Sequence, residues 1–207
     1  MRTWFGTSAG ISVRVLDGLC SLFPEEEQAV RSAVLKRRLE FSTGRWCAHE
    51  ALAQLGAPPA PILMGSLREP VWPGGFIGTI THTDHVSAAV VVRTGLWKGI
   101  GIDILDLTRA GDVLQEASGF IASGEEEGRA RRIAGTGIDA RVLLFSAKES
   151  VIKAISSSFQ RFVDFTEISV ELEEHNFSAS CPGFARPVHG WWKVAEDLLV
   201  TGATLQI

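Results

Sequence analysis

Two carboxylates far apart in the chain are candidate ligands for a hard metal ion. Asp103 interrupts the apolar run GIGIDILDL, and Glu149 lies in the segment RVLLFSAKESVIKAIS. An ionised carboxylate is costly to remove from water unless another group compensates its charge. Mg²⁺ provides such compensation, because it binds one or two protein carboxylates and takes its remaining ligands from water and substrate phosphates. The alternative for Asp103 is the polar face of a half-exposed strand.

Two lysines flank Glu149 in the same segment. At about 100° per residue, a helix over RVLLFSAKESVIKAIS gathers its apolar residues on one side and places Glu149 and Lys153 together on the opposite side. The alternative to a functional role is a solvated surface pair, which stabilises a helix by only about 0.2–0.5 kcal/mol. Lys148 falls beside the apolar face, where a lysine that extends its amine to solvent is equally consistent with the pattern.

Arginines supply a possible phosphate clamp. Arg37 and Arg45 are eight positions apart, so a continuous helix would place them on a shared face across two turns. Arg68 lies in the Pro-rich segment that follows. Guanidinium groups match the geometry of phosphates well. Ordinary solvated charges are the alternative reading of all three.

The histidines do not form a recognised metal motif. A zinc site needs three or four His or Cys ligands, and Cys47, His49, His82 and His85 have no known zinc spacing. His82 is therefore a candidate hydrogen-bonding group. The sequence also lacks a Walker-type or Rossmann glycine pattern, and GIGID is not one.

Composition limits the class of protein. The 207 residues are 45% hydrophobic and 21% charged, which is typical of a globular protein. A formal net charge of −4 argues against a protein that coats nucleic acid or an anionic membrane. No apolar run approaches the roughly 18 residues of a membrane span, and the N-terminus shows no signal peptide. Three widely spaced cysteines suit free thiols in a reducing compartment. We therefore expect a cytoplasmic protein without nucleic-acid or membrane partners.

The first half of the chain predicts a helix followed by three strands. Alternation over 11–16 predicts an earlier strand, and 24–56 reads as helix with an acidic start, a stop at Gly56 and a possible break at 41–44. Residues 57–78 are rich in Pro and Gly and predict mostly loop. The strand-like segments TITHT, HVSAAVVV and KGIGIDILDL then follow.

The second half repeats this order of elements. Helical regions EEEGRARR and ARVLLFSAKESVIKAISSS precede the strand-like segments FTEISVELEE, FSASCPGFARPV and AEDLLVTGATLQI. The pattern predicts an α/β (α+β) fold of two similar halves that meet near residue 100, each with a helix and antiparallel strands. We assign residues 1–100 to the first half and 101–207 to the second.

Four motifs in order resemble one enzyme family. EF-x-x-GRWCAHEAL, REPVWP-GG-x-x-GTITHT, GIGIDI and FSAKESVIKAI resemble the 4′-phosphopantetheinyl transferases, in particular the monomeric branch associated with surfactin and enterobactin synthases. The motifs span roughly residues 36–156. The resemblance implies a pseudo-dimer of two halves within one chain, with coenzyme A in the cleft between them. It also implies transfer of the phosphopantetheine arm of coenzyme A to a serine of an apo acyl or peptidyl carrier protein, with release of adenosine 3′,5′-bisphosphate.

The resemblance assigns roles residue by residue. Asp103 and Glu149 would bind Mg²⁺, and Glu149 is the best candidate base for the carrier serine. Lys153 would contact the phosphates at the breaking bond, with Lys148 beside it, and His82 with Thr81 would hold the pyrophosphate. The implied ligands of the nucleotide and its 3′-phosphate, which make the first half a phosphate clamp, are Arg37, Arg45 and the loop Arg68-Glu69-Pro70.

Two departures from the family pattern raise alternatives. The family usually has a third metal-binding glutamate where this chain has Leu105, so we expect weaker or altered metal dependence. The usual Ser-Ile-Ser-His is here Thr79-Ile-Thr-His82, which keeps both hydroxyls. A catalytically impaired homologue that binds coenzyme A or carrier protein is one alternative function. A phosphotransferase or nucleotide hydrolase on an unrelated α/β fold is another, but it would need a phosphate-binding glycine loop that the chain lacks.

The resemblance also implies a carrier-protein partner in secondary metabolism. Carrier domains of this kind are acidic helical bundles, so the basic residues of EEEGRARRIAG are candidate contacts, namely Arg129, Arg131 and Arg132. A solvated helix face explains these residues equally well. The branch of the family implies a monomer.

Overall fold

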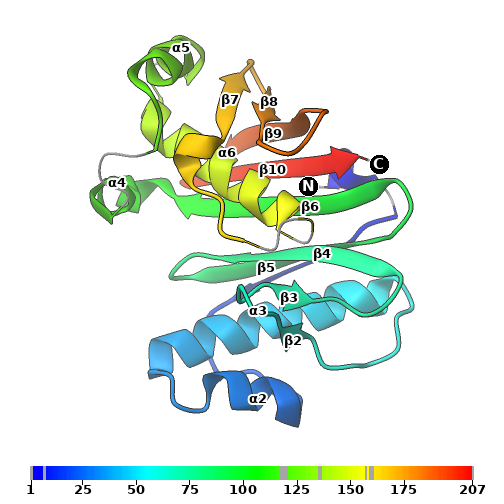
Figure 1. Ribbon diagram of the computed structural model, residues 1–207. Coiled ribbons are helices and arrows are strands. Elements are labelled where there is room, and N and C mark those ends of the chain that lie inside the picture. Colours follow the sequence, from blue (N-terminus) through cyan, green and yellow to red (C-terminus); the bar gives the residue numbers. More distant parts are fainter. Residues whose placement is uncertain are drawn as a thin grey trace. The chain divides into compact units, whose positions relative to one another are not determined.

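The chain divides into two compact units, Met1–Leu96 and Trp97–Ile207. The computed structural model describes residues 2–6, 8–116, 121–134, 137–156, 158 and 161–206 (Figure 1). Each unit combines helices with an antiparallel sheet. The predicted mixed α/β class with antiparallel strands is confirmed.

The first unit packs one long helix against a three-stranded sheet. Its antiparallel strands follow the order β1-β5-β4, and α3 lies along them. The core between them contains the fully buried Cys47, Ala48 and Ala51 of the helix. A Cβ on Gly10 would lie only 1.9 Å from the backbone oxygen of Ala51, so the glycine permits this close approach. The elements are α1 (Arg2–Phe5), β1 (Gly10–Val15), α2 (Pro24–Val30), α3 (Leu35–Gln54), β2 (Leu63–Met64), β3 (Pro70–Val71), β4 (Phe76–His82) and β5 (Val86–Arg93).

The helical region of the first unit is interrupted earlier than predicted. The interruption lies at 31–34, where Val34 adopts an extended conformation before α3 begins. The alternative break at 41–44 is wrong, because α3 runs through these residues and packs Gly44 near Ile80 of β4. Within the predicted loop at 57–78, the two-residue strands β2 and β3 pair with each other.

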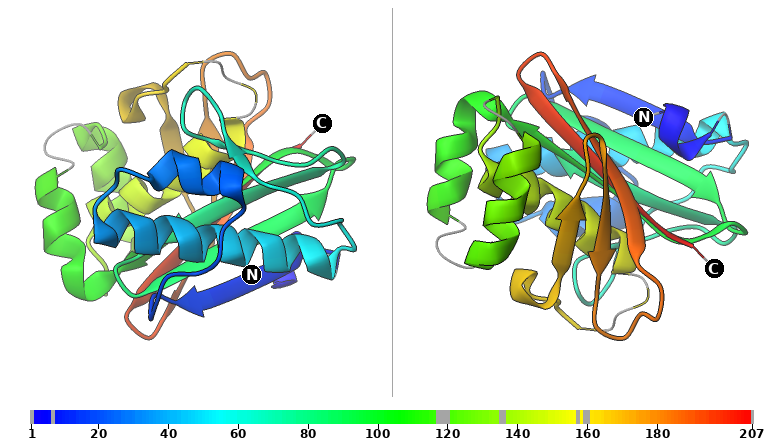
Figure 2. Two further views of the ribbon diagram at one scale, coloured as in Figure 1. Left: turned by 90° about the horizontal axis from the view of Figure 1, so that it is seen from below. Right: turned by 90° about the horizontal axis from the view of Figure 1, so that it is seen from above.

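The second unit packs helices against a five-stranded sheet. Its strand order is β6-β10-β9-β8-β7, and all neighbours are antiparallel. Helix α6 lies along β6 and β10 (Figure 2). The elements are β6 (Trp97–Asp106), η1 (Leu107–Arg109), α4 (Ala110–Glu116), α5 (Gly124–Ala134), α6 (Ala140–Ile155), η2 (Phe165–Glu167), β7 (Ser169–Leu172), β8 (Asn176–Ser180), β9 (Val188–Ala195) and β10 (Leu198–Gln206).

Strand β6 differs from the predicted grouping. The sequence pattern placed KGIGIDILDL third in the set of the first half, but this strand pairs with β10 in the second unit. The third strand of the first sheet is instead β1, which precedes the helices. Order along the chain could not reveal that a strand before α3 returns to pair with β5.

None of the helices among the described residues combines the length and hydropathy needed to cross a membrane. Ser157 in the predicted helix ending ISSS and Gly135 at the end of EEEGRARRIAG lie outside the described residues.

Candidate functional site

The glycines of GIGID bring α6 close to β6. A Cβ on Gly99 would lie 1.8 Å from the backbone oxygen of Ala154, and one on Gly101 would lie 1.8 Å from that of Ser150. Two residues of a strand span about 6.7 Å and four residues of a helix span about 6 Å. Every second residue of β6 can therefore face every fourth residue of α6. Asp103, two residues further on the same face, accordingly meets Ser146, four residues earlier on the helix. The glycines therefore serve helix packing and place the carboxylate against α6.

Asp103 is buried and bonded at both oxygens. Its Oδ1 accepts a hydrogen bond from Lys153 Nζ at 2.7 Å, and its Oδ2 accepts one from Ser146 Oγ at 2.8 Å. The residue is 7% exposed, so the alternative of a solvated strand face is wrong. The lysine charge and the hydroxyl donor together compensate the cost of burying the carboxylate.

Glu149 belongs to the same electrostatic group. Burial raises the pKa of Glu149, the positive charge of Lys153 lowers it, and the negative charge of Asp103 raises it, with a net upward shift. Lys153 turns to Asp103 and is not part of a simple surface pair. We call Asp103, Glu149 and Lys153 the acid–lysine cluster. It combines two carboxylates, one of them reluctant to ionise, with a cation.

The acid–lysine cluster suits Mg²⁺ bound together with a phosphate substrate. Among the described residues, no group of three or more His, Cys, Asp or Glu side chains is placed to hold a metal ion. A dedicated protein cage is therefore not present in that part of the chain. Two carboxylates are nevertheless the usual protein contribution when Mg²⁺ takes its other ligands from water and phosphates. The donor chemistry fits Mg²⁺, and its binding by Asp103 and Glu149 remains a prediction.

The position of the usual third carboxylate lies in the core. Leu105 is 5% exposed, joins the hydrophobic core of the second unit and pairs with Leu199 of β10. Asp106, the next acidic residue, accepts hydrogen bonds from Thr108 N at 2.9 Å and Thr108 Oγ1 at 2.6 Å. Its carboxylate therefore caps η1 locally and does not take the place of the missing glutamate.

Lys148 occupies a buried structural site that the sequence did not predict. It is 1% exposed, and Nζ donates to Ile121 O at 2.8 Å, Glu126 Oε2 at 2.9 Å and Phe165 O at 3.1 Å. These bonds use all three of its donors. Glu126 Oε1 in turn accepts from Val170 N at 2.7 Å. An amine extended to solvent therefore does not describe Lys148, and its predicted contact with coenzyme A would have to replace one of these bonds.

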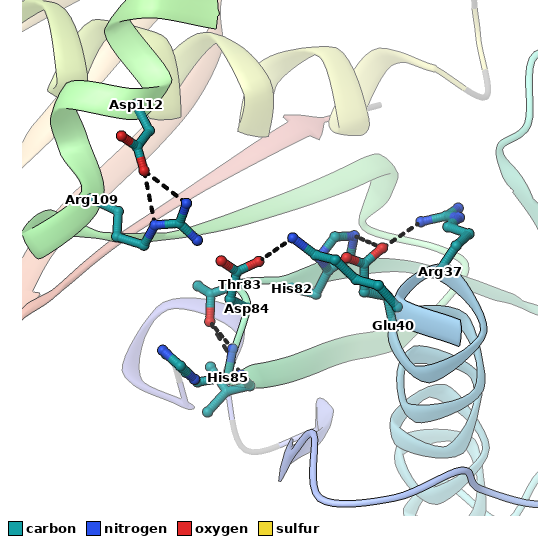
Figure 3. A network of polar contacts seen from close by, with 10 residues as sticks. Arg37, Glu40, His82, Thr83, Asp84, His85, Arg109 and Asp112 are labelled. Atoms are coloured by element: carbon teal, nitrogen blue, oxygen red, sulfur yellow. Dashed lines mark hydrogen bonds and ion pairs between the residues drawn. The ribbon is translucent and has the colours of Figure 1, made fainter. Parts of the chain in front are cut away.

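In the first unit, an acidic residue links two of the predicted phosphate ligands. Glu40 Oε2 lies 3.3 Å from Arg37 Nη1 and 3.9 Å from His82 Nε2 (Figure 3). The turn after His82 is ordered by Thr83, whose Oγ1 accepts from the backbone N–H groups of residues 85 and 86, each at 3.1 Å. The first turns of α3 and the end of β4 thus present a cation and an imidazole side by side. Glu40 was not singled out from the sequence.

Thr81 lies on the opposite face of β4 from His82, because side chains alternate along a strand. It is buried, whereas His82 is partly exposed. A shared role in holding one pyrophosphate remains a prediction for this pair.

Arg45 is buried beside Glu26. Its guanidinium lies 4.6 Å from the centre of the Phe41 ring, and its Nε lies 3.9 Å from Glu26 Oε1. Burial lowers the pKa of Arg45 to about 10, although the charge of Glu26 opposes this. Burial also acts to raise the pKa of Glu26, but hydrogen bonds from His49 and from the backbone N–H groups of residues 62 and 23 outweigh it and lower the pKa. Arg45 therefore joins a network that fixes α2 against α3.

The Arg68 loop connects β2 and β3. Arg68 adopts a left-handed conformation with φ of 68° and is exposed. Glu69 Oε2 accepts from Leu67 N at 2.9 Å, and Glu69 O accepts from Gly65 N at 2.8 Å. Pro70 starts β3 opposite Met64. Glu69 thus shapes its own turn, and Arg68 remains the group available to an external anion.

Comparison with known families identifies the chain. Residues 25–92 match the model of the 4′-phosphopantetheinyl transferase N-terminal domain, and residues 99–198 match that of the 4′-phosphopantetheinyl transferase superfamily. The chain belongs to the 4′-phosphopantetheinyl transferase superfamily. The resemblance inferred from the four motifs is confirmed, and the protein is an enzyme of this type.

The chain is similar in sequence to several known proteins over most of their length. The chain is 37% identical to the 4′-phosphopantetheinyl transferase PptT of Mycobacterium tuberculosis, over 88% of this chain and 74% of that protein. It is 34% identical to the 4′-phosphopantetheinyl transferase Svp of Streptomyces mobaraensis, over 97% of this chain and 85% of that protein. Enterobactin synthase component D of Escherichia coli K12 is 33% identical, over 80% of this chain and 76% of that protein.

Proposed function

We propose that the protein transfers the 4′-phosphopantetheine arm of coenzyme A to a serine of an apo acyl or peptidyl carrier protein in a Mg²⁺-dependent reaction. Membership of the transferase superfamily supports the reaction type. The acid–lysine cluster is the observation that carries the proposal, because it combines carboxylates for a metal with a cation for phosphate. Carriers of secondary metabolism, a cytoplasmic location and a monomeric state complete the proposal.

The proposed reaction breaks the phosphoanhydride bond of coenzyme A and forms a phosphoester bond to the carrier serine. The serine hydroxyl attacks the β-phosphorus of the pyrophosphate, a new P–O bond forms, and the bond to the bridging oxygen breaks. Adenosine 3′,5′-bisphosphate leaves with that oxygen, and the serine proton passes to Glu149. Such phosphoryl transfer depends mainly on positioning and charge stabilisation.

Each member of the acid–lysine cluster has a distinct proposed role. Glu149, directly or through a water, takes the serine proton as general base. Lys153 provides fixed positive charge where negative charge develops on the leaving oxygens. Mg²⁺, when bound by Asp103 and Glu149, would neutralise the pyrophosphate.

The first unit supplies the proposed grip on coenzyme A. Arg37, His82 and Arg68 are exposed or partly exposed, which supports contact with phosphates. The buried Arg45 supports the same surface through its network with Glu26. In α5, Arg129 and Arg131 pair with Glu125 and Glu127, so contact with a carrier protein would compete with pairs within the helix.

One assay separates transfer from binding alone. The protein is incubated with coenzyme A, MgCl₂ and an apo carrier protein, and the carrier is analysed by mass spectrometry. Addition of the arm, with adenosine 3′,5′-bisphosphate as the second product and loss of activity with EDTA, is expected. Binding of coenzyme A without any mass gain on acyl or peptidyl carriers would favour the impaired homologue.

Leu105→Glu should tighten the binding of Mg²⁺ and lower the stability of the folded protein. A carboxylate two residues from Asp103 on the same face of β6 adds a candidate Mg²⁺ ligand, so we expect half-maximal activity at a lower Mg²⁺ concentration. Because Leu105 is buried in the core, the same change should lower the melting temperature without metal. Leu105→Gln is the matched control, since it has similar size but no charge. Equal Mg²⁺ dependence of Leu105→Glu and wild type would contradict the expectation.

A further inference from the structure

Two buried hydroxyl groups stand behind the second oxygen of Asp103. Ser146 Oγ donates to Asp103 Oδ2 at 2.8 Å, and Ser146 Oγ lies 3.0 Å from Thr201 Oγ1. Thr201 Oγ1 also donates to the backbone oxygen of Ser146 at 2.8 Å. Both Ser146 and Thr201 are fully buried. The carboxylate is therefore hydrogen-bonded to a pair of hydroxyl groups that are buried from water. We call this pair, Ser146 and Thr201, the hydroxyl relay.

The proton of Ser146 has a fixed destination. An ionised carboxylate can only accept, and a serine hydroxyl has one proton and two acceptor positions. The bond between Ser146 and Asp103 therefore requires the serine proton to point at Oδ2. Thr201 has a single proton, which its hydroxyl donates to the backbone oxygen of Ser146, and its Oγ1 lies 3.0 Å from Ser146 Oγ; these contacts hold the serine from the other side.

The relay joins three elements at one point. Thr201 of β10 is directly opposite Asp103 of β6 in the sheet, and Ser146 reaches both from α6. The close approach allowed by Gly99 and Gly101 fixes the helix against the strand on the same side. The two oxygens of Asp103 consequently differ: Oδ2 is held by an immobile neutral donor, and Oδ1 is held by the partly exposed Lys153.

We propose that Ser146, oriented by Thr201, is a positioning residue that holds Asp103 Oδ2 so that Oδ1 is presented to the metal ion that binds the substrate phosphates. The inference rests on the proposed function. It has particular weight in this chain because Leu105 occupies the position of the family's third carboxylate, which leaves metal binding more dependent on the orientation of Asp103. Groups that orient a metal ligand typically contribute 10–100-fold to affinity or activity.

Direct metal binding tests the proposal apart from turnover. Mn²⁺, which accepts the same carboxylate and phosphate oxygens as Mg²⁺, is titrated into the protein with coenzyme A present and followed by electron paramagnetic resonance. For Ser146→Ala we expect a roughly 10–100-fold weaker Mn²⁺ affinity. The Mg²⁺ concentration for half-maximal transfer should rise in parallel, with the KM for the carrier protein unchanged.

Ser150→Ala is the matched control. Ser150 is also fully buried, one turn further along α6, but its hydroxyl donates to Ala147 O at 2.7 Å and not to a carboxylate. We expect wild-type Mn²⁺ affinity for this variant. Thr201→Val should weaken Mn²⁺ binding, whereas Thr201→Ser, which keeps the hydroxyl, should restore it. This pair keeps the test decisive if Ser146→Ala does not fold, as judged by thermal melting.

The results distinguish a failure of the positioning role of Ser146 and Thr201 from a failure of the proposed function. If Ser146→Ala and Thr201→Val bind Mn²⁺ as tightly as Ser150→Ala while the wild type transfers normally, the positioning role is overturned and the proposed function stands. If the wild type neither binds Mn²⁺ with coenzyme A nor modifies any carrier, the proposed function fails and the relay proposal fails with it.

Discussion

Glu149→Gln will lose carrier modification by at least about 100-fold at saturating Mg²⁺, while it melts at a higher temperature than the wild type at pH 7. The loss follows from removal of the proposed base, whose contribution in enzymes is typically about 10²–10⁴-fold. The gain in stability follows from the raised pKa of Glu149, because ionising this partly buried carboxyl near Asp103 costs free energy in the folded state.

The pH dependence of this gain has a definite sign. An acid whose pKa is raised on folding favours the folded state at low pH, and this contribution is lost as pH rises from the ordinary value of 4.5 through the folded pKa. Glutamine resembles the neutral acid at every pH. The melting temperature of Glu149→Gln should therefore exceed that of the wild type at pH 7, and the difference should shrink as pH falls towards 4.5.

Thermal melting in EDTA across this pH range measures the effect. The carrier assay on the same preparations measures turnover. Asp112→Asn is the matched control, since Asp112 is an exposed acid paired with Arg109 on the surface. Normal turnover by Glu149→Gln would remove Glu149 as the base, and a lower melting temperature at pH 7 would contradict the sign of its pKa shift.

Local patterns predicted the elements and the central pair of carboxylates. Helical periodicity placed Glu149 and Lys153 on one side of α6, and the apolar run GIGIDILDL indicated the strand β6 with Asp103 inside it. Both signals depend on neighbours in the sequence, which a single sequence displays. The family resemblance added roles to these positions, and the family itself is confirmed by the comparisons.

Partners distant in sequence could not be predicted. Ser146 and Thr201 are ordinary small polar residues until the register of β6 and β10 places them beside Asp103. Glu40 looked like one charge in a mixed run, yet it bridges Arg37 and His82. These contacts depend on strand pairing and on helix placement, which periodicity does not encode.

The Lys148–Glu126 ion pair shows how misleading a local pattern can be. Glu126 lies in the charged run EEEGRARR, which reads as a solvated face, and Lys148 neighbours the proposed base Glu149 in sequence. In the structure their contact is 2.9 Å, with both side chains almost completely buried. The pair connects α5 to α6, and further bonds extend it to η2 and β7.

Removing either partner alone should destabilise the protein strongly. Lys148→Met leaves the Glu126 charge buried, and Glu126→Gln leaves the Lys148 charge buried, each at an expected cost of about 3–5 kcal/mol. The double variant Lys148→Met/Glu126→Gln removes both charges and keeps an amide oxygen for Val170 N. We expect it to be more stable than either single variant, because an uncompensated buried charge costs more than the absence of the pair.

Urea denaturation of the four proteins at pH 7 measures the coupling. Additive losses in the double variant would contradict an ion pair as the source of the effect. Coenzyme A binding by calorimetry then tests the role first predicted for Lys148. Because its three donors are used within the second unit, the folded double variant should bind coenzyme A with wild-type affinity. A large loss of affinity in a stably folded double variant would instead show that Lys148 contributes to the binding of coenzyme A.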